Sequence, residues 1–562
     1  MTSKTWHKLP APPAGFSQAV GLPPFQAHLL YNRGIRHRSE IEPYLSADSR
    51  LRNDPMLLPD MGSAVSRLTK AIDANELIGV FGDFDTDGIT GTALLVRGLG
   101  DVGARVLPYL PDRLDEGHGL NDDAVRALTG RGVTLLVTVD CGASSIDEIA
   151  LAASLGADTI VTDHHNLTDN PPASFALINP KRSDSAYPYR ELTGVGMAFK
   201  LVEALYAEIG EPWPAHLLEL VALGTVADVG PLTGENRSLV KEGIERLKTT
   251  QNPGLRALAD VSKVKLASLA TDDLSFRLIP RLNAPGRVGS ARTSLDLLTT
   301  TSEEEAALLA SQMELMNRER RALTEEAMQE AERQVAQVSA DEGVPPLAFV
   351  ESEAWTPGIL GLIAARLTDL YHRPAVAVAR GSATSRASAR SIPGLDLYAV
   401  LAASAGMFDR FGGHSQAAGF TVPTASLPAL RRQLVATASE KLDGVDLIEE
   451  LDVECEVPLS LPCQVEFDFV QTLSPFGAEN PAPVFLTRGA RVIDARTVGR
   501  DRQHLKMRLG DDGGSWDAIA FRQGDMLAAA RDRIDVVYTV ALDNWGERPK
   551  VQLTVLDMRA SR

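Results

Sequence analysis

The chain contains 562 residues, carries a formal net charge of −18 at pH 7 and is 44% hydrophobic. At roughly 150 residues per domain, this length predicts about three or four domains rather than a single core. The hydrophobic fraction and a charged fraction of 23% are typical of folded proteins and exclude global disorder. Three cysteines without a Cys-x-x-Cys pair exclude a disulfide scaffold and a cysteine-rich zinc module.

Targeting and membrane signals are the next class that the sequence argues against. Prolines interrupt residues 1–15, where a secretory signal needs an unbroken apolar run. No later segment has the length and apolar character of a membrane span. We therefore expect a cytoplasmic protein without a membrane partner.

The overall acidity, with a pI near 5.1, argues against nucleic acid as a ligand when it is taken alone. Basic residues nevertheless gather locally. Residues 274–295 and 370–395 contain no acid, and their arginines are Arg277, Arg281, Arg287, Arg292, Arg373, Arg380, Arg386 and Arg390. A third basic stretch covers residues 487–509. Because an acidic protein can focus a positive groove locally, the net charge does not exclude nucleic-acid binding.

Residues 77–230 alternate apolar runs with helical patterns. The runs at residues 77–81, 105–109, 134–139 and 158–162 read as buried strands, with helices between them. Continuous β-branched strands separated by helices predict a parallel sheet that is covered on both faces. In such sheets the chemistry gathers at the carboxyl ends of the strands.

Residues 302–340 predict one long helix that connects two lobes. Ser302 followed by Glu305 predicts a capping box, and Leu309, Met313, Met316 and Leu323 form a narrow apolar stripe. A second α/β unit follows. We expect strands at residues 347–350 and 375–379, a helix at residues 359–370, and helices around Leu397 and Leu427.

The last 110 residues or so predict a five-stranded OB-type barrel. The expected strands are residues 490–498, 504–509, 515–521, 535–542 and 550–556, with a helix at residues 523–531. Such barrels bind single strands through stacking aromatics and a basic track. Trp516, Phe521, Tyr538 and Trp545 are candidates for stacking; the alternative is that most of these rings form the barrel core.

Acidic and histidine motifs follow the predicted strands. Asp83-Phe84-Asp85-Thr86-Asp87-Gly88 follows the first strand, Asp140-Cys141-Gly142 the third, and Asp163-His164-His165 the fourth; Asp228 closes an apolar helix. Carboxylates that converge on one sheet edge repel one another and need a cation. Mixed carboxylate and imidazole ligands favour Mn²⁺ or Mg²⁺.

Three competing interpretations concern single motifs. An EF-hand needs a helix before the loop and a Glu at its twelfth position, which is Leu94 here, so that interpretation fails. A strand-end histidine is often only hydrogen-bonded in place, but His164 follows two other acidic strand ends. We expect Cys141 to be a small buried neighbour of Asp140, without chemistry of its own.

Together these motifs resemble the DHH phosphoesterase superfamily, and the later motifs narrow the resemblance to the bacterial RecJ single-stranded-DNA-specific exonucleases. The narrowing motifs are Ile-Pro-Arg-Leu-Asn-Ala-Pro-Gly-Arg at residues 279–287, Trp-Thr-Pro-Gly-Ile-Leu-Gly at 355–361, Gly-Gly-His-Ser-Gln-Ala-Ala-Gly at 412–419 and Ser-Pro-Phe-Gly-Ala-Glu-Asn-Pro at 474–481. The resemblance covers the chain from about residue 50 to its end. It departs from the family at Thr356, where many relatives have His.

The resemblance implies an N-terminal segment (1–48), a DHH catalytic domain (49–300), a connecting helix (301–343), a DHH-associated domain (344–448) and an OB domain (449–562). It also implies two divalent metal ions, Mn²⁺ or Mg²⁺. By motif, Asp83, Asp85 and Asp140 would surround one ion, and Asp87, Asp140, His164 and Asp228 the other. The predicted catalytic residues are Asp85, Asp140, His165 and His414, with His165 either touching the substrate phosphate or lying behind the ligands.

DNA contacts are implied in the same way. Ser388, Arg390 and the preceding Arg373 suit a terminal 5′ phosphate, because a guanidinium grips phosphate bidentately. Further predicted contacts are Arg113, Arg281, Asn283, Arg287, Gly413, His414 and Trp516. Each arginine taken singly is as well explained as a solvated surface charge.

The implied function is a 5′→3′ exonuclease that hydrolyses single-stranded DNA to mononucleotides in DNA repair and recombination in the bacterial cytoplasm. The implied partners are single-strand-binding protein and a RecQ-type helicase, and a monomer is expected. One alternative is a DHH phosphodiesterase acting on oligoribonucleotides or cyclic dinucleotides. A non-catalytic replication scaffold is the other, but every proposed ligand position holds a competent ligand.

Overall fold

The parallel sheet predicted from the apolar runs is present in the computed structural model, which describes residues 4–113, 115–445, 447–543 and 550–561. Its strand order is β3-β2-β4-β5-β6, and all neighbouring strands are parallel. The strands are β2 (Leu77–Gly82), β3 (Arg105–Tyr109), β4 (Val133–Val139), β5 (Asp158–Thr162) and β6 (Ala176–Ile178). The first four confirm the predicted runs, whereas β6 is too short to carry a pattern of its own.

Helices cover both faces of this sheet, as a buried parallel sheet requires. Val137 of β4 packs into the core on one face and its neighbour Leu136 into the core on the other. The first core lies under α4 (Met61–Asp73), α5 (Thr86–Asp101), α8 (Gly194–Ile209), α9 (Leu218–Ala227) and α10 (Gly234–Leu247). The second lies under α6 (Asp122–Gly130) and α7 (Ile146–Ser154). We call this unit the catalytic lobe.

A run of shorter helices completes the catalytic lobe and leads to the long helix. They are α11 (Pro253–Ser262), α12 (Thr271–Asp273), α13 (Ile279–Leu282), α14 (Pro285–Val288) and α15 (Arg292–Thr299). A single π-helical turn, Leu274–Leu278, lies between α12 and α13. This run contains the first of the two acid-free arginine stretches.

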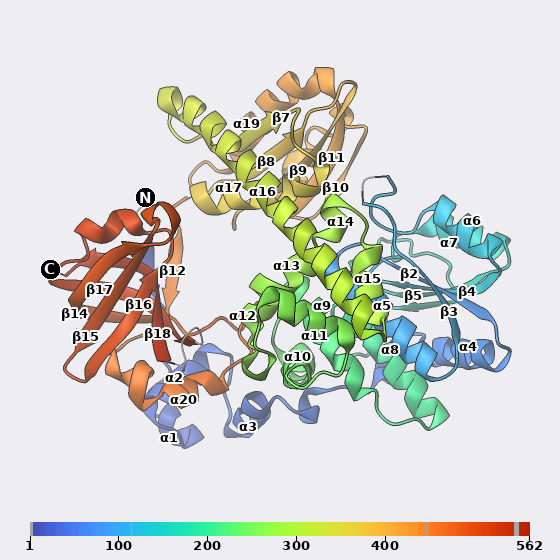
Figure 1. Cartoon of the computed structure of the whole chain (residues 1–562), viewed down its shortest axis with the longest axis horizontal. Helices are drawn as coiled ribbons and strands as arrows, with labels where there is room; N and C mark the ends of the chain where they lie inside the picture. Colours follow the sequence, from blue (N-terminus) through green and yellow to red (C-terminus); the bar gives the residue numbers. More distant parts are fainter. Residues whose placement is uncertain (1–3, 114, 446, 544–549, 562) are drawn as a thin grey trace.

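The predicted connecting helix is α16 (Glu303–Glu342), which crosses the molecule diagonally in Figure 1. Ala310 and Met313 of its first half pack into the catalytic lobe, and Ala331 and Val335 of its second half pack into another core. The Ser302 Oγ accepts the Glu305 N–H at 3.2 Å, as a cap should. The second half of the predicted capping box is wrong, because the Glu305 carboxylate accepts the Thr300 hydroxyl instead.

The unit after α16, which we call the second lobe, is a five-stranded sheet in the order β10-β11-β9-β8-β7. Its strands are β7 (Ala348–Ser352), β8 (Ala375–Ala379), β9 (Thr384–Arg390), β10 (Arg410–Gly413) and β11 (Ala417–Pro423). Its helices are α17 (Leu360–Tyr371), α18 (Leu397–Ala402) and α19 (Leu427–Lys441). The predicted β7, β8 and helices are confirmed. The sequence did not reveal β9, β10 and β11, because these strands are rich in Gly, Ala, Ser and Arg rather than large apolar residues.

The C-terminal barrel closes where β14 pairs with both β15 and β17. Its strands are β14 (Phe485–Val498), β15 (His504–Asp511), β16 (Gly514–Ala520), β17 (Arg533–Asp543) and β18 (Lys550–Ala560). The helix predicted at residues 523–531 is wrong: only a 3₁₀ segment, Gly524–Ala528, forms there. A Cβ on Gly524 would lie 2.1 Å from the Arg502 carbonyl oxygen, so this segment follows the barrel wall closely.

The four aromatic residues proposed for stacking differ in their surroundings. Tyr538 is fully buried and its hydroxyl lies 3.0 Å from the Thr487 Oγ1, so its predicted stacking role is wrong and it belongs to the core. Trp516 is half-buried against the barrel core, whereas Phe521 is 55% exposed. Trp545 lies outside the described residues.

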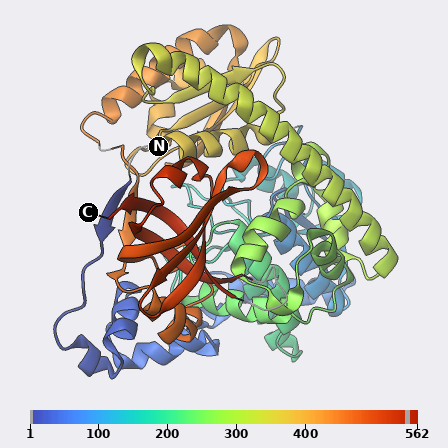
Figure 2. The same cartoon turned by 60° about the vertical axis from the view of Figure 1, so that its left-hand side comes forward.

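The N-terminal segment lies against the barrel, with its helices below the barrel and its first strand beside it, as Figures 1 and 2 show. It contains β1 (Thr5–Lys8), α1 (Phe16–Val20), α2 (Pro24–Asn32) and α3 (Arg38–Ser46). β1 pairs in parallel with β12 (Glu450–Val453), and Leu29 and Leu30 enter the barrel core. The buried Arg237 of α10 donates to the backbone carbonyls of Tyr44 and Ser474, so the segment also ties the barrel to the catalytic lobe.

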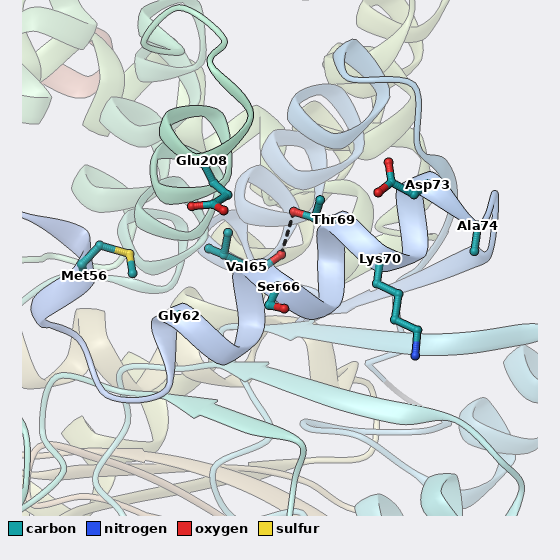
Figure 3. Close-up of a pocket in the computed structure, with 9 residues that line it drawn as sticks. All are labelled: Met56, Gly62, Val65, Ser66, Thr69, Lys70, Asp73, Ala74 and Glu208. Atoms are coloured by element: carbon teal, nitrogen blue, oxygen red, sulfur yellow. Dashed lines mark hydrogen bonds between the residues drawn. The ribbon is translucent and has the colours of Figure 1, made fainter.

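A groove of about 600 Å³ runs along α4 at the surface of the catalytic lobe (Figure 3). Its lining residues are Met56, Gly62, Val65, Ser66, Thr69, Lys70, Asp73, Ala74 and Glu208. None of the strand-end acids lines this groove, so we assign it no chemistry. In the part of the chain that the structure describes, we find no helix with the length and apolar character needed to cross a bilayer.

The two lobes touch where Gly358, in the 3₁₀ turn before α17, lies against Arg287 of α14. A Cβ on Gly358 would lie 2.2 Å from the Arg287 backbone oxygen, and the Arg287 Nη1 donates to the Gly358 carbonyl at 3.0 Å. Only glycine fits this contact without moving the backbone. Gly406 has no atom within 4 Å of a Cβ built on it, which makes it a matched control.

We expect Gly358→Ala to destabilise the folded chain by about 1–3 kcal/mol, the range typical of overpacking. Gly406→Ala should change stability by less than about 0.5 kcal/mol, as exposed substitutions do. Urea unfolding of both variants measures the difference. Equal stabilities would show that the lobe contact tolerates a methyl group.

Candidate active site

The first acids are placed by the turn between β2 and α5. Asp85 is the N-cap of α5, and its Oδ1 accepts the N–H groups of Asp87 at 2.9 Å and Gly88 at 3.2 Å. A Cβ on Gly88 would lie 2.4 Å from the Asp83 carbonyl oxygen, so only glycine permits this tight turn. The alternating acids of the motif therefore come together at the carboxyl end of β2.

Asp140 follows β4 and has a left-handed backbone, with φ of 62°. The N-terminus of α8 packs directly against it, since a Cβ on Gly194 would lie 2.4 Å from the Asp140 Cβ. The same N-terminus binds Asp87, whose Oδ2 and Oδ1 accept the N–H groups of Gly194 at 2.7 Å and Val195 at 2.8 Å. The positive end of α8 thus partly offsets the negative charge of Asp87.

His164 lies at the centre of the remaining acids. Its Nε2 is 3.0 Å from the Asp140 Oδ1, 3.8 Å from the Asp228 Oδ2 and 3.9 Å from the Asp87 Oδ2. Asp228 caps the C-terminus of α9, so two strand ends and two helix ends supply this group.

The six predicted metal ligands therefore lie together, and we call them the acidic cluster: Asp83, Asp85, Asp87, Asp140, His164 and Asp228. Their donor atoms form two compact sets in which all atoms lie within 4.8 Å of one another. One set is Asp83, Asp85 and Asp140, and the other is Asp87, His164 and Asp228. A third set joins Asp140 and His164 to His165, so Asp140 and His164 are shared.

The cluster is unfavourable without a cation. Burial and then the charges of neighbouring carboxylates raise the pKa of Asp140 and of Asp87 well above the usual range. The same causes raise the pKa of Asp228 to about 7. The Asp83 Oδ1 is buried and has no hydrogen-bond partner. These four carboxylates are the donor set that a hard divalent cation prefers, and they fit such an ion.

Asp163 was not among the predicted site residues, although it is the first residue of the Asp163-His164-His165 motif. Its Oδ1 lies 2.7 Å from the His165 Nδ1 and accepts the N–H groups of His164 and His165, while its Oδ2 accepts the Ala143 N–H. The hydrogen bond to Asp163 raises the pKa of His165 to about 9. Burial, followed by the charge of His165, lowers the pKa of His164 to about 3. The pKa values of the two adjacent histidines are therefore shifted in opposite directions, which favours the charged form of His165 and the neutral form of His164.

His118 was also missed, because the loop that carries it has no periodic pattern. Its Nδ1 lies 3.0 Å from the Asp83 Oδ2, and its ring lies 4.2 Å from the Phe84 ring. On the same Phe84 ring, the Arg113 guanidinium carbon lies 4.0 Å from the centroid. Burial is the main cause of the pKa shifts of His414, His164 and Asp228, and the charge of Lys181, in the loop after β6, acts on all three more weakly.

His414 belongs to the second lobe but faces the acidic cluster. Burial, then the charges of His165 and Arg390, lower the pKa of His414, so these groups lie close to it. The preceding Gly413 has φ of 135°, and a Cβ there would lie 2.4 Å from the Ala417 carbonyl oxygen. Glycine therefore permits the tight turn between β10 and β11 that carries His414.

The predicted phosphate-binding residues divide into two groups. Arg113, Arg287 and Arg390 lie near one another at the border of the two lobes, since the charges of Arg113 and Arg390 lower the pKa of Arg287 after burial does. Ser388 accepts from Arg390 at 3.2 Å, and the Asn283 Oδ1 accepts the Thr86 N–H at 3.1 Å beside Asp85. Arg113 and Asn283 of this first group lie beside the acidic cluster.

The second group is engaged elsewhere. Arg281 donates to the Glu314 carboxylate of α16 at 2.7 Å, and Arg373 donates to the Leu447 carbonyl at 3.2 Å. Trp516 lies in the barrel, against its core. Their DNA contacts stay predictions.

Three family models match the chain, each within one structural unit. The DHH family, N-terminal domain, matches residues 77–225, the DHHA1 domain matches residues 344–441, and the RecJ OB domain matches residues 453–557.

Curated relatives match most of the chain. The single-stranded-DNA-specific exonuclease RecJ of Escherichia coli (strain K12) is 36% identical over 530 residues, which cover 89% of this chain and 89% of the relative. The protein of the same name from Bacillus subtilis (strain 168) is 34% identical over 553 residues, which cover 97% of this chain and 69% of the relative.

Solved structures agree with these relatives. RecJ from Thermus thermophilus in complex with Mn²⁺ matches with a TM-score of 0.85 and 30% identity, over 99% of this chain and 80% of that one. The same protein in complex with Mg²⁺ matches with a TM-score of 0.79, over 99% of this chain and 79% of that one. The chain therefore belongs to the RecJ family of single-stranded-DNA-specific exonucleases.

Proposed function

We propose that this chain is a 5′→3′ exonuclease that hydrolyses single-stranded DNA to mononucleotides, using two divalent cations, Mn²⁺ or Mg²⁺. The observation that carries the proposal is the pair of donor sets within the acidic cluster, which adjoin at Asp140 and His164. The relatives that match nearly the whole chain are named as single-stranded-DNA-specific exonucleases, and RecJ of Thermus thermophilus was solved with each of these two cations.

The ligands follow from the two sets. Asp83, Asp85 and Asp140 would hold one cation, and Asp87, His164 and Asp228, with Asp140, would hold the other. When bound, the cations would supply the positive charge that offsets the carboxylates, stabilises charge on the phosphate and activates water for attack. His164 suits a ligand because its lowered pKa favours the neutral imidazole, and Asp87 is pre-oriented by the N–H groups of Gly194 and Val195.

The histidines around the cluster have separate tasks in the proposal. His165, held charged by Asp163, would attract the scissile phosphate and stabilise its developing negative charge. His414 would approach the same phosphate from the second lobe. Asp163 acts through His165 and is a positioning residue. His118 would orient Asp83.

Recognition of the strand falls to the surrounding residues. Arg113, Arg287, Ser388 and Arg390 would bind phosphate, and Asn283 would keep the start of α5 in place. The barrel would hold the strand farther from the cluster, with Phe521 exposed for stacking and Trp516 beside the core. An enzyme for oligoribonucleotides or cyclic dinucleotides would not need this barrel. Single-stranded DNA is therefore the substrate that explains why the chain has a barrel as well as two lobes.

The wider role is proposed on the resemblance alone. We expect the chain to act as a monomer in the cytoplasm, in DNA repair and recombination. Single-strand-binding protein and a RecQ-type helicase would supply single strands with free 5′ ends.

The polarity is tested with single-stranded oligonucleotides that carry a fluorophore at one end or the other. With Mn²⁺ present, label at the 5′ end should appear first as a mononucleotide, while label at the 3′ end should stay on progressively shorter strands. Gel or chromatographic time courses distinguish the two orders. Early release of 3′-terminal nucleotides would contradict the proposal.

Asp140→Asn should lower hydrolysis of single-stranded DNA by at least about a hundredfold. Loss of a residue that only hydrogen-bonds to a metal ligand already lowers metal affinity or activity about 10–100-fold, and Asp140 is itself a proposed ligand. Asp169→Asn, an exposed loop acid, should leave hydrolysis unchanged. In EDTA, Asp140→Asn should raise the thermal midpoint, since it removes one charge from the buried carboxylates. Added Mn²⁺ should stabilise the wild type more than this variant.

Kinetics in Mn²⁺ and thermal unfolding in EDTA and in Mn²⁺ measure these effects. Wild-type turnover in Asp140→Asn would overturn the metal mechanism. A thermal midpoint that falls in EDTA would show that the carboxylates do not repel one another.

A further inference from the structure

The border between the two lobes holds four guanidinium groups that come from three parts of the chain. Arg113 and Arg287 belong to the catalytic lobe, Arg390 ends β9 of the second lobe, and Arg320 lies in the middle of α16. We call these residues the arginine border. Arg320 was not among the predicted DNA contacts, because a single arginine on a long charged helix carries no signal.

The partners of the arginine border are neutral. Arg113 donates to the Gly286 carbonyl, Arg287 to the Gly358 carbonyl, and Arg390 to the Ala389 carbonyl and the Ser388 hydroxyl. Other arginines nearby do have acids: Arg281 pairs with Glu314 at 2.7 Å and Arg366 with Glu325 at 3.3 Å. Within the described ranges, no carboxylate lies within 4.0 Å of a guanidinium nitrogen of the four border arginines.

Arg320 differs from the other three in having a buried side-chain nitrogen without a hydrogen-bond partner. Its side chain is half-buried, and its one side-chain hydrogen bond in the described structure runs from Nη2 to the Asn317 Oδ1 at 2.9 Å. Its Nε is buried and has no partner. A buried charged donor without an acceptor is costly, and a guanidinium has five N–H groups to satisfy.

Repulsion among the guanidiniums of the arginine border adds to the free-energy cost of burying them. Burial is the main cause that lowers the pKa of Arg287 to about 9, and the charges of Arg113, Arg320 and Arg390 follow. Burial also lowers the pKa of Arg320, followed by the charges of Arg321, Arg366 and Arg281. Positive charges that are gathered, partly buried and paired only with neutral groups are stabilised when an anion with several oxygens lies between them.

We propose that Arg320 binds a backbone phosphate of the DNA strand, so that the connecting helix itself is part of the substrate-binding surface. The inference rests on the proposed function, which supplies the phosphodiester as the ligand. Helix α14, which carries Arg287, packs against α16, and the charge of Arg320 acts on Arg287, so both guanidiniums would bind the same stretch of the strand. Asn317, which is 2% exposed, fixes Arg320 in this orientation from one helical turn away.

Helix α16 offers a matched control. Arg333 lies on the same helix, is exposed, and donates from its Nε to the Gln329 carbonyl at 3.2 Å. It has the same charge and the same helical setting as Arg320 but lies outside the arginine border. Substitution of either residue removes one unit of charge from the same long helix.

The experiment measures binding of the metal-free chain, in EDTA, to a fluorescent 20-nucleotide oligo(dT) with a 5′ phosphate, by anisotropy over a range of salt concentrations. For Arg320→Gln we expect Kd to rise by about tenfold, as loss of one charged hydrogen bond predicts. The slope of log K against log salt should fall by about 0.7, the value for one phosphate contact on a single strand. Arg333→Gln should change neither quantity.

A wild-type salt slope in Arg320→Gln would overturn the inference. If Arg320→Gln lowers the thermal midpoint, Arg320→Lys decides the case: it keeps the charge and should keep the slope while losing part of the affinity. A slope that falls in Arg320→Lys as far as in Arg320→Gln would assign Arg320 a structural role. A wild-type chain that neither binds nor cleaves the strand would instead contradict the proposed function, so the two failures are distinguishable.

Discussion

Mutual repulsion among buried carboxylates is the constraint on which the rest of the structure depends. Asp83, Asp85, Asp87 and Asp140 meet because β2 and β4 are neighbouring parallel strands, whose carboxyl ends share one edge. Local contacts hold the acids in place despite this repulsion. Asp85 caps the N-terminus of α5, the first N–H groups of α8 bind Asp87, and glycines occupy positions where a side chain would collide. Divalent cations would offset the repulsion among these carboxylates.

A second unfavourable arrangement, of opposite sign, lies beside the first. The arginine border brings together positive charges from the catalytic lobe, α16 and the second lobe. Among the described residues, the acids whose charges act on them are Asp83 and Asp85 of the acidic cluster, which form no ion pair with them. Cations bound in the acidic cluster would offset the repulsion among its carboxylates, and a polyanion bound along the arginine border would offset the repulsion among its guanidiniums. The contact between Gly358 and Arg287 holds the second lobe, which carries His414 and Arg390, against the catalytic lobe.

Sequence reasoning predicted what strong local patterns encode. The four long apolar strands, the helix α16 and the strand-end acids were found because each has periodicity or a motif of its own. β9, β10 and β11 were missed because their small and polar residues are buried by tertiary packing rather than by an apolar pattern. Asp163, His118 and Arg320 were missed for a related reason: their importance comes from what they contact, and contacts such as that of His118 with Asp83 join residues that no spacing rule connects. The sequence left open whether Tyr538 stacks on DNA or lies in the core, because an aromatic residue in a barrel strand carries no mark of which way it faces; the structure places it in the core.

Diffraction from crystals soaked in MnCl₂, with anomalous differences collected at the manganese edge, tests the central claim most directly. We expect two anomalous peaks, one among Asp83, Asp85 and Asp140 and one among Asp87, His164 and Asp228. In crystals of Asp140→Asn both peaks should be weaker than in the wild type. A map without density beside Asp140, or with manganese bound only elsewhere on the chain, would contradict it.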